Sequence, residues 1–178
     1  NKLKINSLIA SASYYIGLFK LVLIRFLNVF IMGKKVEIVL TVQASSLYAM
    51  SNPSPTDIDL KCSLSDDNSG SSSNGTLMNF LSKVYLNQDV KWKGVTNDQG
   101  YSVAIDSIVF EPESSDVNFF DTSTIHGTGG RSGNATAKVK NDSNLIDKHD
   151  KYTLNFSVYA NGNSSKSFQI DPKLAANP

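Results

Sequence analysis

The amino-acid sequence predicts an all-β protein, folded as an antiparallel β-sandwich whose two sheets are arranged in an immunoglobulin-like or jelly-roll-like way. Three observations support this prediction. Apolar residues recur at every second position in many short segments, and turn-forming residues separate these segments. After Met32 we find no convincing helical periodicity, except for a short candidate in Leu77–Tyr85. Strands with one apolar and one polar face are typical of antiparallel sheets.

The first predicted strand is Val36–Val42, in which apolar residues alternate with mostly polar ones. Because successive side chains of a strand point to opposite faces, this alternation places the apolar groups on one side. The same pattern continues in further segments: Val90–Lys93, Tyr101–Asp106, Ala135–Lys140, Tyr152–Ala160 and Ser165–Ile170.

Short polar motifs join these strands. Asn161-Gly162 lies between the last two, and because both central residues of a type I′ turn need a positive φ, this pair predicts a β-hairpin. Asn97–Gly100 is expected to have the same role between two earlier strands. The run Asn52–Pro55, with two prolines, excludes a continuous helix or a central strand. Asp66–Gly75 is expected to be a long polar loop.

Residues 1–31 differ in composition from the rest of the chain. They contain four basic residues and no acidic one, whereas residues 32–178 carry 13 basic and all 16 acidic residues, a formal net charge of −3. We therefore predict a hydrophobic basic leader, 1–31, followed by one domain, 32–178. The leader fits three interpretations: translated upstream sequence before a start at Met32, a targeting signal or membrane anchor, or an amphipathic helix. Lys20 and Arg25 interrupt the apolar stretch that a membrane span would need.

The composition argues against several function classes. The whole chain has a formal net charge of +1, which does not fit a protein that coats nucleic acid. Its single cysteine, Cys62, excludes an internal disulfide framework and a cysteine-based zinc site, and its two histidines, His126 and His149, exclude a histidine-rich metal centre. We expect no nucleic acid among the partners and, for residues 32–178, no membrane.

Candidate catalytic residues are few. His126 lies in the glycine-rich segment Thr124–Arg131, but no Gly-x-Ser-x-Gly motif or phosphate-binding loop accompanies it. Glu111 and Glu113 follow an apolar strand, two residues apart on an extended chain, which is poor geometry for an opposed acid and base. We interpret these segments as a flexible loop and a solvated strand end, and Cys62 as a small buried hydrophobic residue. The sequence therefore predicts no enzyme and no catalytic residue, with a hydrolase using His126 or the two glutamates as the weaker hypothesis.

Oxygen-bearing side chains gather in three predicted loops, Asp66–Asn68, Asn141–Asn144 and Asn161–Ser165. Such residues can bind Ca²⁺, but none of the loops has the EF-hand spacing, and turn formation explains the same residues. Tyr159 falls on the polar face of its strand, and Phe119-Phe120 follow a polar stretch. These aromatic residues could stack on a sugar, seal a subunit contact or lie under a loop.

Four segments stand in one order: Val36–Val42, Asn52–Thr56, Asp89–Lys93 and a closing block that reads YTLNFSVY before IDPK. With this pattern, residues 34–175 resemble the bacterial inclusion body protein family, the PixA/AidA group. The resemblance implies a single β-sandwich domain without known catalytic residues, found in intracellular inclusions of some bacteria. The three methionines of this chain depart from the methionine-rich composition of some members.

From this resemblance we expect a non-enzymatic protein that acts through self-association, as a homo-oligomer, or through ligand binding. The expected location is cytoplasmic, in inclusions, with secretion as the alternative if the leader is a signal peptide.

The closing hairpin, Leu154–Phe168, is also similar to that of calcium-dependent galactose-binding bacterial lectins, in which the loop between the two strands holds metal and sugar. This likeness implies an alternative function as a carbohydrate-binding module, with or without Ca²⁺, that uses the Asn161–Ser165 loop for a glycan. The implied ligand-binding residues are Tyr159, Asn161, Asn163 and Ser164, and the implied metal ligands are Asn161 and Asn163.

Overall fold

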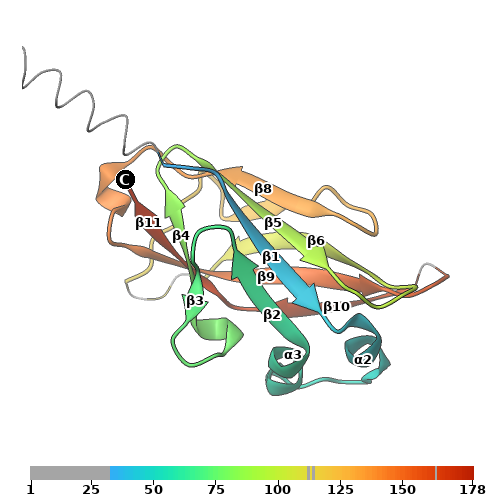
Figure 1. Ribbon diagram of the computed structural model, residues 1–178. Helices are drawn as coiled ribbons and strands as arrows, with labels where there is room; N and C mark the ends of the chain where they lie inside the picture. The colour runs from blue at the N-terminus through green and yellow to red at the C-terminus, as the bar shows by residue number, and fades with distance from the viewer. Residues whose placement is uncertain (1–32, 112, 114, 163) are drawn as a thin grey trace, which may run out of the picture. The chain divides into compact units, whose positions relative to one another are not determined.

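The computed structural model describes residues 33–111, 113, 115–162 and 164–178, so the predicted leader lies outside the described residues. Two β-sheets pack against each other around a hydrophobic core (Figure 1). The all-β sandwich predicted from the sequence is therefore confirmed. Within the described part of the chain, no helix is long and apolar enough to cross a membrane.

The smaller sheet has four strands in the order β2-β1-β5-β8. Their bounds are Cys62–Asp66, Val36–Val42, Asp89–Val95 and Asn134–Lys138. The larger sheet has the order β3-β4-β11-β9-β6-β7, and β10 pairs with β9 beside β11. These strands are Ser71–Ser72, Phe80–Tyr85, Lys173–Asn177, His149–Tyr159, Ser102–Phe110 and Thr124–His126, with β10 at Ser165–Ile170.

Both sheets are mixed, which differs from the purely antiparallel arrangement expected from the sequence. β1 pairs in parallel with β5, and β4 pairs in parallel with β11. In each case a long stretch of chain separates the two strands, which a parallel pairing needs for its crossover connection. Alternation of apolar and polar residues reports which face of a strand is buried, and carries no information on the direction of its neighbour.

The core forms where the apolar faces of the two sheets meet. In β1 the buried and half-buried positions alternate strictly, as the sequence predicts. Trp92 of β5 and Tyr152 of β9 meet across the sandwich, and the indole N–H of Trp92 donates a hydrogen bond of 3.1 Å to the Tyr152 hydroxyl. Phe119 and Phe120 are buried in the same core, and the Phe120 ring lies edge-on to Trp92. Of the alternatives left open for Phe119-Phe120, burial is therefore the one that the structure supports, and neither ring is available to a sugar or a subunit contact.

Two short helices, which the sequence did not predict, follow β1. They are α2, Ala44–Ala49, and α3, Pro55–Lys61. Ser54 caps α3: its hydroxyl accepts from the Asp57 N–H, and the Asp57 carboxylate accepts from the Ser54 N–H. Pro55 occupies the first turn, where its missing N–H costs no hydrogen bond. The Asn52–Pro55 run therefore leads into a helix. Proline disrupts the interior of a helix, but it is well tolerated in the first turn.

The helical candidate at Leu77–Tyr85 is wrong in large part. Only Leu77–Asn79 form a single 3-10 turn, η1, and Phe80–Tyr85 form strand β4 with an alternating burial pattern. A second short 3-10 turn, η2, covers Ser143–Leu145. Within the predicted loop Asp66–Gly75, the short strand β3 pairs with β4.

On one side of the sandwich, backbone hydrogen bonds join the two sheets. The Ile105 N–H donates to the Gly133 carbonyl, and the Thr128 N–H donates to the Asn134 carbonyl, each at 2.9 Å. Gly127 allows this close approach, since a Cβ there would lie 2.0 Å from the Ile105 carbonyl oxygen. The glycine-rich segment around His126, expected to be a flexible loop, therefore begins as strand β7 and continues as the bridge to β8.

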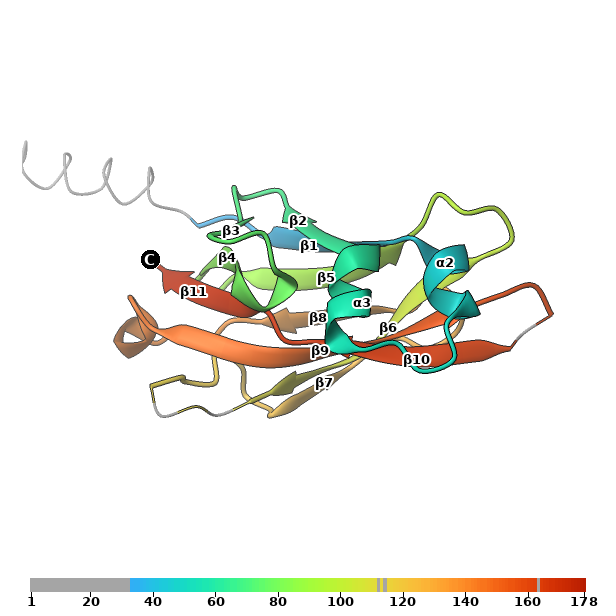
Figure 2. The ribbon, with the colours of Figure 1, turned by 90° about the horizontal axis from the view of Figure 1, so that it is seen from below.

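On the opposite side, helix α3 lies between strand β2 of the smaller sheet and β10 of the larger one (Figure 2). Its one buried residue, Ile58, faces the core. The sheets are thus bonded to each other on one side and separated by a helix on the other. On this second side, none of the strands that the structure describes pairs with the outer edge of β10.

Candidate functional site

Strands β9 and β10 form the predicted hairpin, with Phe156 opposite Phe168 in its centre. The connection differs from the two-residue type I′ turn expected for Asn161-Gly162. The Ala160 N–H donates to the Ser164 carbonyl at 3.1 Å, so three positions, 161–163, separate the closing pair instead of two. Among the described residues of the turn, only Gly162 has a positive φ, of 93°. The longer turn relieves Asn161 of the left-handed conformation that a type I′ turn demands.

The register of the hairpin determines which backbone groups of β10 face outward. In an antiparallel pair, hydrogen-bonded positions alternate with positions whose N–H and C=O point away from the partner. Because Ala160 bonds to Ser164, Lys166, Phe168 and Ile170 are the positions bonded to β9. Ser165, Ser167 and Gln169 therefore direct their N–H and C=O groups away from β9, toward the open edge. None of the backbone hydrogen bonds between elements of the described chain involves these groups.

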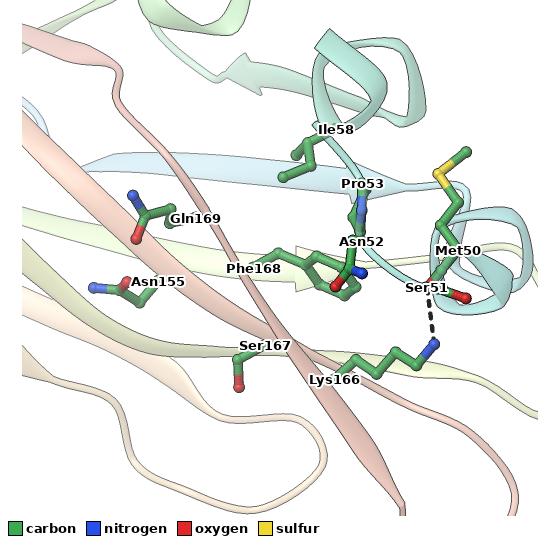
Figure 3. A pocket seen from close by; sticks show the side chains of 10 residues that line it. All are labelled: Met50, Ser51, Asn52, Pro53, Ile58, Asn155, Lys166, Ser167, Phe168 and Gln169. Carbon is green, nitrogen blue, oxygen red and sulfur yellow. Dashed lines mark hydrogen bonds between the residues drawn. The ribbon is translucent and has the colours of Figure 1, made fainter. Parts of the chain in front are cut away.

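A groove runs along this edge (Figure 3). It has a volume of about 610 Å³ and lies between Lys166–Gln169, with Asn155, on one side and Met50–Pro53, with Ile58, on the other. A second hollow of about 580 Å³ shares Pro53, Ile58 and Gln169 with the first and continues to Asp171. Together they follow β10 along most of its length.

Lys166 is the one charged residue of β10, and its ammonium group is already occupied. It donates to the carbonyl oxygens of Tyr48 and Met50, at 2.6 and 2.9 Å, and lies 5.0 Å from the centre of the Tyr48 ring. Figure 3 shows the side chain extended from the strand toward Met50. These contacts tie the end of α2 to β10 and hold the Met50–Pro53 wall of the groove in place.

The residues implied by the lectin resemblance lie at the hairpin end of the sandwich, outside both hollows. Tyr159 is half-buried, with the Arg131 guanidinium 5.6 Å from the centre of its ring. Asn161 and Ser164 are exposed, and the Ser164 hydroxyl accepts from the Tyr48 hydroxyl at 2.7 Å. Asn163 lies outside the described residues. The glycan site and the Ca²⁺ ligands Asn161 and Asn163 therefore stay predictions.

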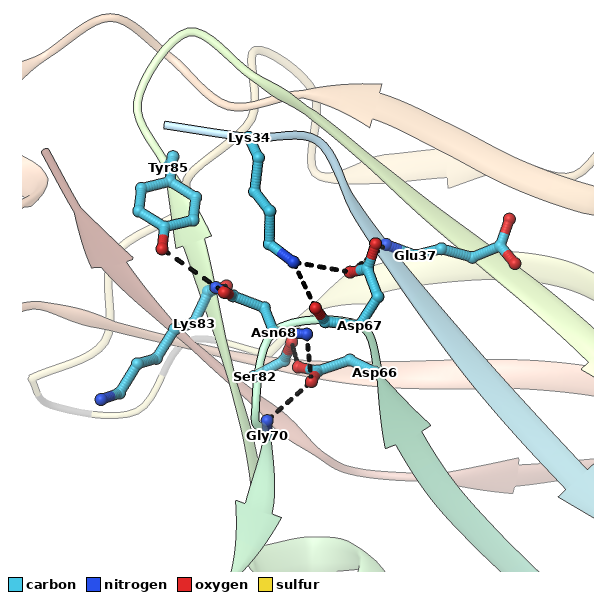
Figure 4. A network of polar contacts seen from close by, with 9 residues as sticks. All are labelled: Lys34, Glu37, Asp66, Asp67, Asn68, Gly70, Ser82, Lys83 and Tyr85. Atoms are coloured by element: carbon cyan, nitrogen blue, oxygen red, sulfur yellow. Dashed lines mark hydrogen bonds and ion pairs between the residues drawn. The ribbon is translucent and has the colours of Figure 1, made fainter. Parts of the chain in front are cut away.

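The Asp66–Asn68 segment, another calcium candidate, is engaged in turn formation (Figure 4). One oxygen of Asp66 accepts from the N–H groups of Asn68 and Gly70, at 2.9 and 2.6 Å. The other accepts from the hydroxyl of Ser82, which is fully buried. Among the described residues, no group of three or more histidine, cysteine or acidic side chains could hold a metal ion. These contacts agree with the interpretation of the segment as a turn.

Replacing Asp66 with alanine should lower the free energy of unfolding by roughly 1–3 kcal/mol, because the buried Ser82 hydroxyl and two turn N–H groups lose their acceptor. Chemical denaturation of the full chain measures this loss. The neighbouring Asp67 is the matched control, since its carboxylate makes only exposed contacts, an ion pair with Lys34 and a hydrogen bond from the Glu37 N–H. Asp67→Ala should cost less than about 1 kcal/mol, and equal losses in the two variants would contradict the role given to Asp66.

The candidate catalytic residues occupy separate structural positions. His126 is exposed at the end of β7. Glu111 accepts from the Thr153 hydroxyl, and Glu113 pairs with the Lys151 ammonium, whose hydrogen bond lowers the pKa of Glu113. Burial raises the pKa of the Cys62 thiol to about 12, which keeps it protonated and unreactive. Cys62 packs against the core, in keeping with its interpretation as a small hydrophobic residue.

Comparison with known proteins yields distant structural likenesses. No family model matches the chain, and no curated protein sequence matches it. The inclusion body protein PixA from Burkholderia cenocepacia is 11% identical, with a TM-score of 0.47, over 81% of this chain and 96% of that one. Murine CRIg is 12% identical (TM-score 0.33; 55% and 92% of the two chains), and the bradyzoite-specific antigen BSR4 from Toxoplasma gondii is 7% identical (0.28; 55% and 44%). Likenesses of this strength assign neither family nor function.

The groove residues were not singled out in the sequence. Lys166, Ser167 and Gln169 belong to a predicted strand, but alternation does not tell whether a strand lies inside a sheet or at its edge. The sequence contains one indication that this strand lies at an edge. The short strand is followed by Asp171-Pro172, and proline is disfavoured in a central strand. The opposite wall depends on α3. From the sequence, the prolines before this helix indicate only that no continuous helix or central strand passes through them.

Proposed function

We propose that this chain is a non-enzymatic β-sandwich protein that works by self-association, and that the contact surface is the free edge of β10. The observation that carries the proposal is the row of outward N–H and C=O groups on Ser165, Ser167 and Gln169, with an open groove beside it. An unpaired edge of this kind pairs readily with another strand. The sequence resemblance to inclusion body proteins, which gather in cytoplasmic inclusions, is in keeping with this proposal.

The other edges are less suited to pairing. β3 has two residues and β7 three, which leaves little ladder to extend. At the β8 edge, the first residue, Asn134, is engaged by the bonds that join the sheets. β2, like β10, lies beside α3, and it also contacts η1. β10 offers six residues, of which the three with outward backbone groups are exposed.

Replacing Ser167 with proline should weaken self-association at least about tenfold while leaving the domain folded. Proline removes the outward N–H and places its ring at the edge, but it leaves the backbone ladder to β9 intact because the Ser167 N–H and C=O face away from β9. The one bond lost toward β9 is between the Ser167 and Ser157 hydroxyls, which lie 3.1 Å apart. Sedimentation velocity of the full chain over a range of concentrations measures the association, and circular dichroism checks the fold.

Ser167→Thr is the matched control, since threonine keeps the N–H and the hydroxyl, and it should associate as the unmodified chain does. A chain that stays monomeric at the highest concentrations would overturn the proposed self-association. Self-association that is equal in the proline and threonine variants would show that the chain assembles through a surface other than β10.

A further inference from the structure

We infer that the strand which pairs with β10 is β10 of a second copy, antiparallel to it, with Ser167 opposite Ser167 of the partner subunit. This inference rests on the proposed self-association and adds the identity and register of the contact. It would make one continuous sheet from the larger sheets of two copies, related by a two-fold axis at Ser167. Such an arrangement is closed, because each copy uses its β10 edge once.

The first argument is the match of hydrogen-bonding groups. In this register Ser167 meets its own counterpart, and Ser165 meets Gln169 of the partner subunit. All outward residues of both strands then pair, with roughly six hydrogen bonds, two for each pair. A shift by two residues in either direction removes one of these residues from the ladder.

The second argument is charge. If the axis passed through Lys166, the two lysines would lie directly opposite each other, which is unfavourable. With the axis at Ser167, Lys166 lies opposite Phe168 of the partner subunit, and no like charges face each other. The three edge residues carry no charge, and the Lys166 ammonium is bound to the Tyr48 and Met50 carbonyls. The lysine that could keep a second strand away is therefore held by its own chain.

The third argument is space. Five residues, 165–169, extend about 17 Å as a strand. The groove beside Lys166–Gln169 has a volume of about 610 Å³ in which we place the backbone of the incoming strand, and Met50–Pro53 forms a wall along it. The hollow that continues past Gln169 to Asp171 lies where the partner's chain runs on toward its hairpin turn.

Disulfide trapping tests the register in the full chain. Cys62 is first replaced by alanine, so that introduced cysteines are the only thiols. Ser167→Cys should form a disulfide-linked dimer on mild oxidation, because facing residues of paired strands lie about 5.5 Å apart between Cα atoms, within disulfide range. Non-reducing electrophoresis measures the yield.

Ser165→Cys is the matched control. In the inferred register the two copies of residue 165 are offset by about 13 Å, beyond disulfide range, so this variant should give at least tenfold less dimer. The double variant Ser165→Cys with Gln169→Cys should restore the crosslink. If sedimentation shows dimers but Ser165→Cys crosslinks as well as Ser167→Cys, the register is wrong while the proposed function stands. If sedimentation shows only monomers, the proposed function fails as well.

Discussion

Replacing Phe156 with alanine should lower the free energy of unfolding by about 3–5 kcal/mol, the largest loss expected for one substitution in this chain. Phe156 is fully buried in the middle of β9, which is bonded to β6 on one side and to β10 on the other. Its ring lies 5.6 Å from that of Phe168, centre to centre. The substitution removes these contacts and leaves a cavity between the sheets. Because the core is closely packed, the neighbouring side chains cannot fill this cavity unless several strands move.

The single tryptophan reports this unfolding directly. Trp92 is fully buried in β5, and its aromatic neighbours are Phe120 and Tyr152, not Phe156. The fluorescence of Trp92 therefore reports the unfolding of the whole domain. Urea titration of the full chain gives the free energy of unfolding. Phe156→Leu, which keeps most of the volume, should cost less than about 1.5 kcal/mol. A loss below about 1 kcal/mol for the alanine variant, which is the size of a surface change, would contradict a packed two-sheet core.

Asp150 is the second position where a large effect is expected. The residue is 1% exposed. One oxygen accepts from the Phe119 N–H at 2.8 Å, and the other is buried without a hydrogen-bond partner among the described residues. Burial raises the pKa of Asp150 to about 7; the charge of Asp116 acts in the same direction, and the Phe119 N–H and Lys140 oppose it.

The stability of the chain should therefore fall as the pH rises from about 4 to about 7. In this window the unfolded state releases the Asp150 proton near its ordinary pKa of about 3.9, while the folded state keeps it up to about 7, so deprotonation favours unfolding. Above pH 7 the loss is complete, at roughly 2–4 kcal/mol. Asp150→Asn mimics the protonated acid, so it should match the unmodified chain near pH 4 and exceed its stability at pH 8.

Urea titrations of the unmodified chain and of Asp150→Asn at several pH values test this expectation. The difference between their free energies of unfolding separates the effect of Asp150 from the effects of the other acidic residues. Those with lowered pKa values, such as Asp57 and Asp98, act in the opposite sense, since they lose stabilisation as the pH falls. Asp116→Asn, which removes a neighbouring charge and leaves the buried carboxyl in place, is the control and should change the pH profile only slightly. A constant difference between Asp150→Asn and the unmodified chain at all pH values would contradict a buried, protonated Asp150.

The strands that face the core on one side and water on the other were predictable from the sequence. Alternation located β1, β5, β6, β9 and β10, and the Asn-Gly pair located the last hairpin. In these segments local pattern and burial agree, because each strand is long enough for its period to show. The same pattern could not reveal that β1 and β5 run in parallel, since direction depends on the path of the chain between them.

The alternation of apolar and polar residues could not predict the short elements or the buried polar positions. Helix α3 has seven residues, too few for a helical period, and its signal is the cap formed by Ser54 and Asp57. Thr153 and Ser157, on the expected wet face of β9, are buried and bond to Asp171 and Asp106. A polar side chain can be buried where another group forms a hydrogen bond with it. Here that group comes from a distant part of the sequence, so the local pattern does not reveal it.

The groove illustrates the same limit for function. Its strand was predicted, but its free edge depends on the topology. β10 and β11 share one side of β9, and of these two strands only β11 pairs with a further strand within residues 33–178 as described. Its other wall comes from residues more than a hundred positions earlier in the chain. A single sequence does not place such segments together. The sequence therefore led to an expectation of self-association or ligand binding, with Tyr159 or Phe119-Phe120 as candidate contact residues, and did not point to this groove.

Amide hydrogen exchange of the full chain at low and high concentration tests the central proposal most directly. In dilute solution the amides of Ser165, Ser167 and Gln169 should exchange rapidly, because they face outward from β10, whereas those of Lys166, Phe168 and Ile170 should be protected by β9. At high concentration the first three should become protected, and the second three should change little. Rapid exchange of Ser165, Ser167 and Gln169 in a sample that sedimentation shows to be associated would contradict pairing through this edge.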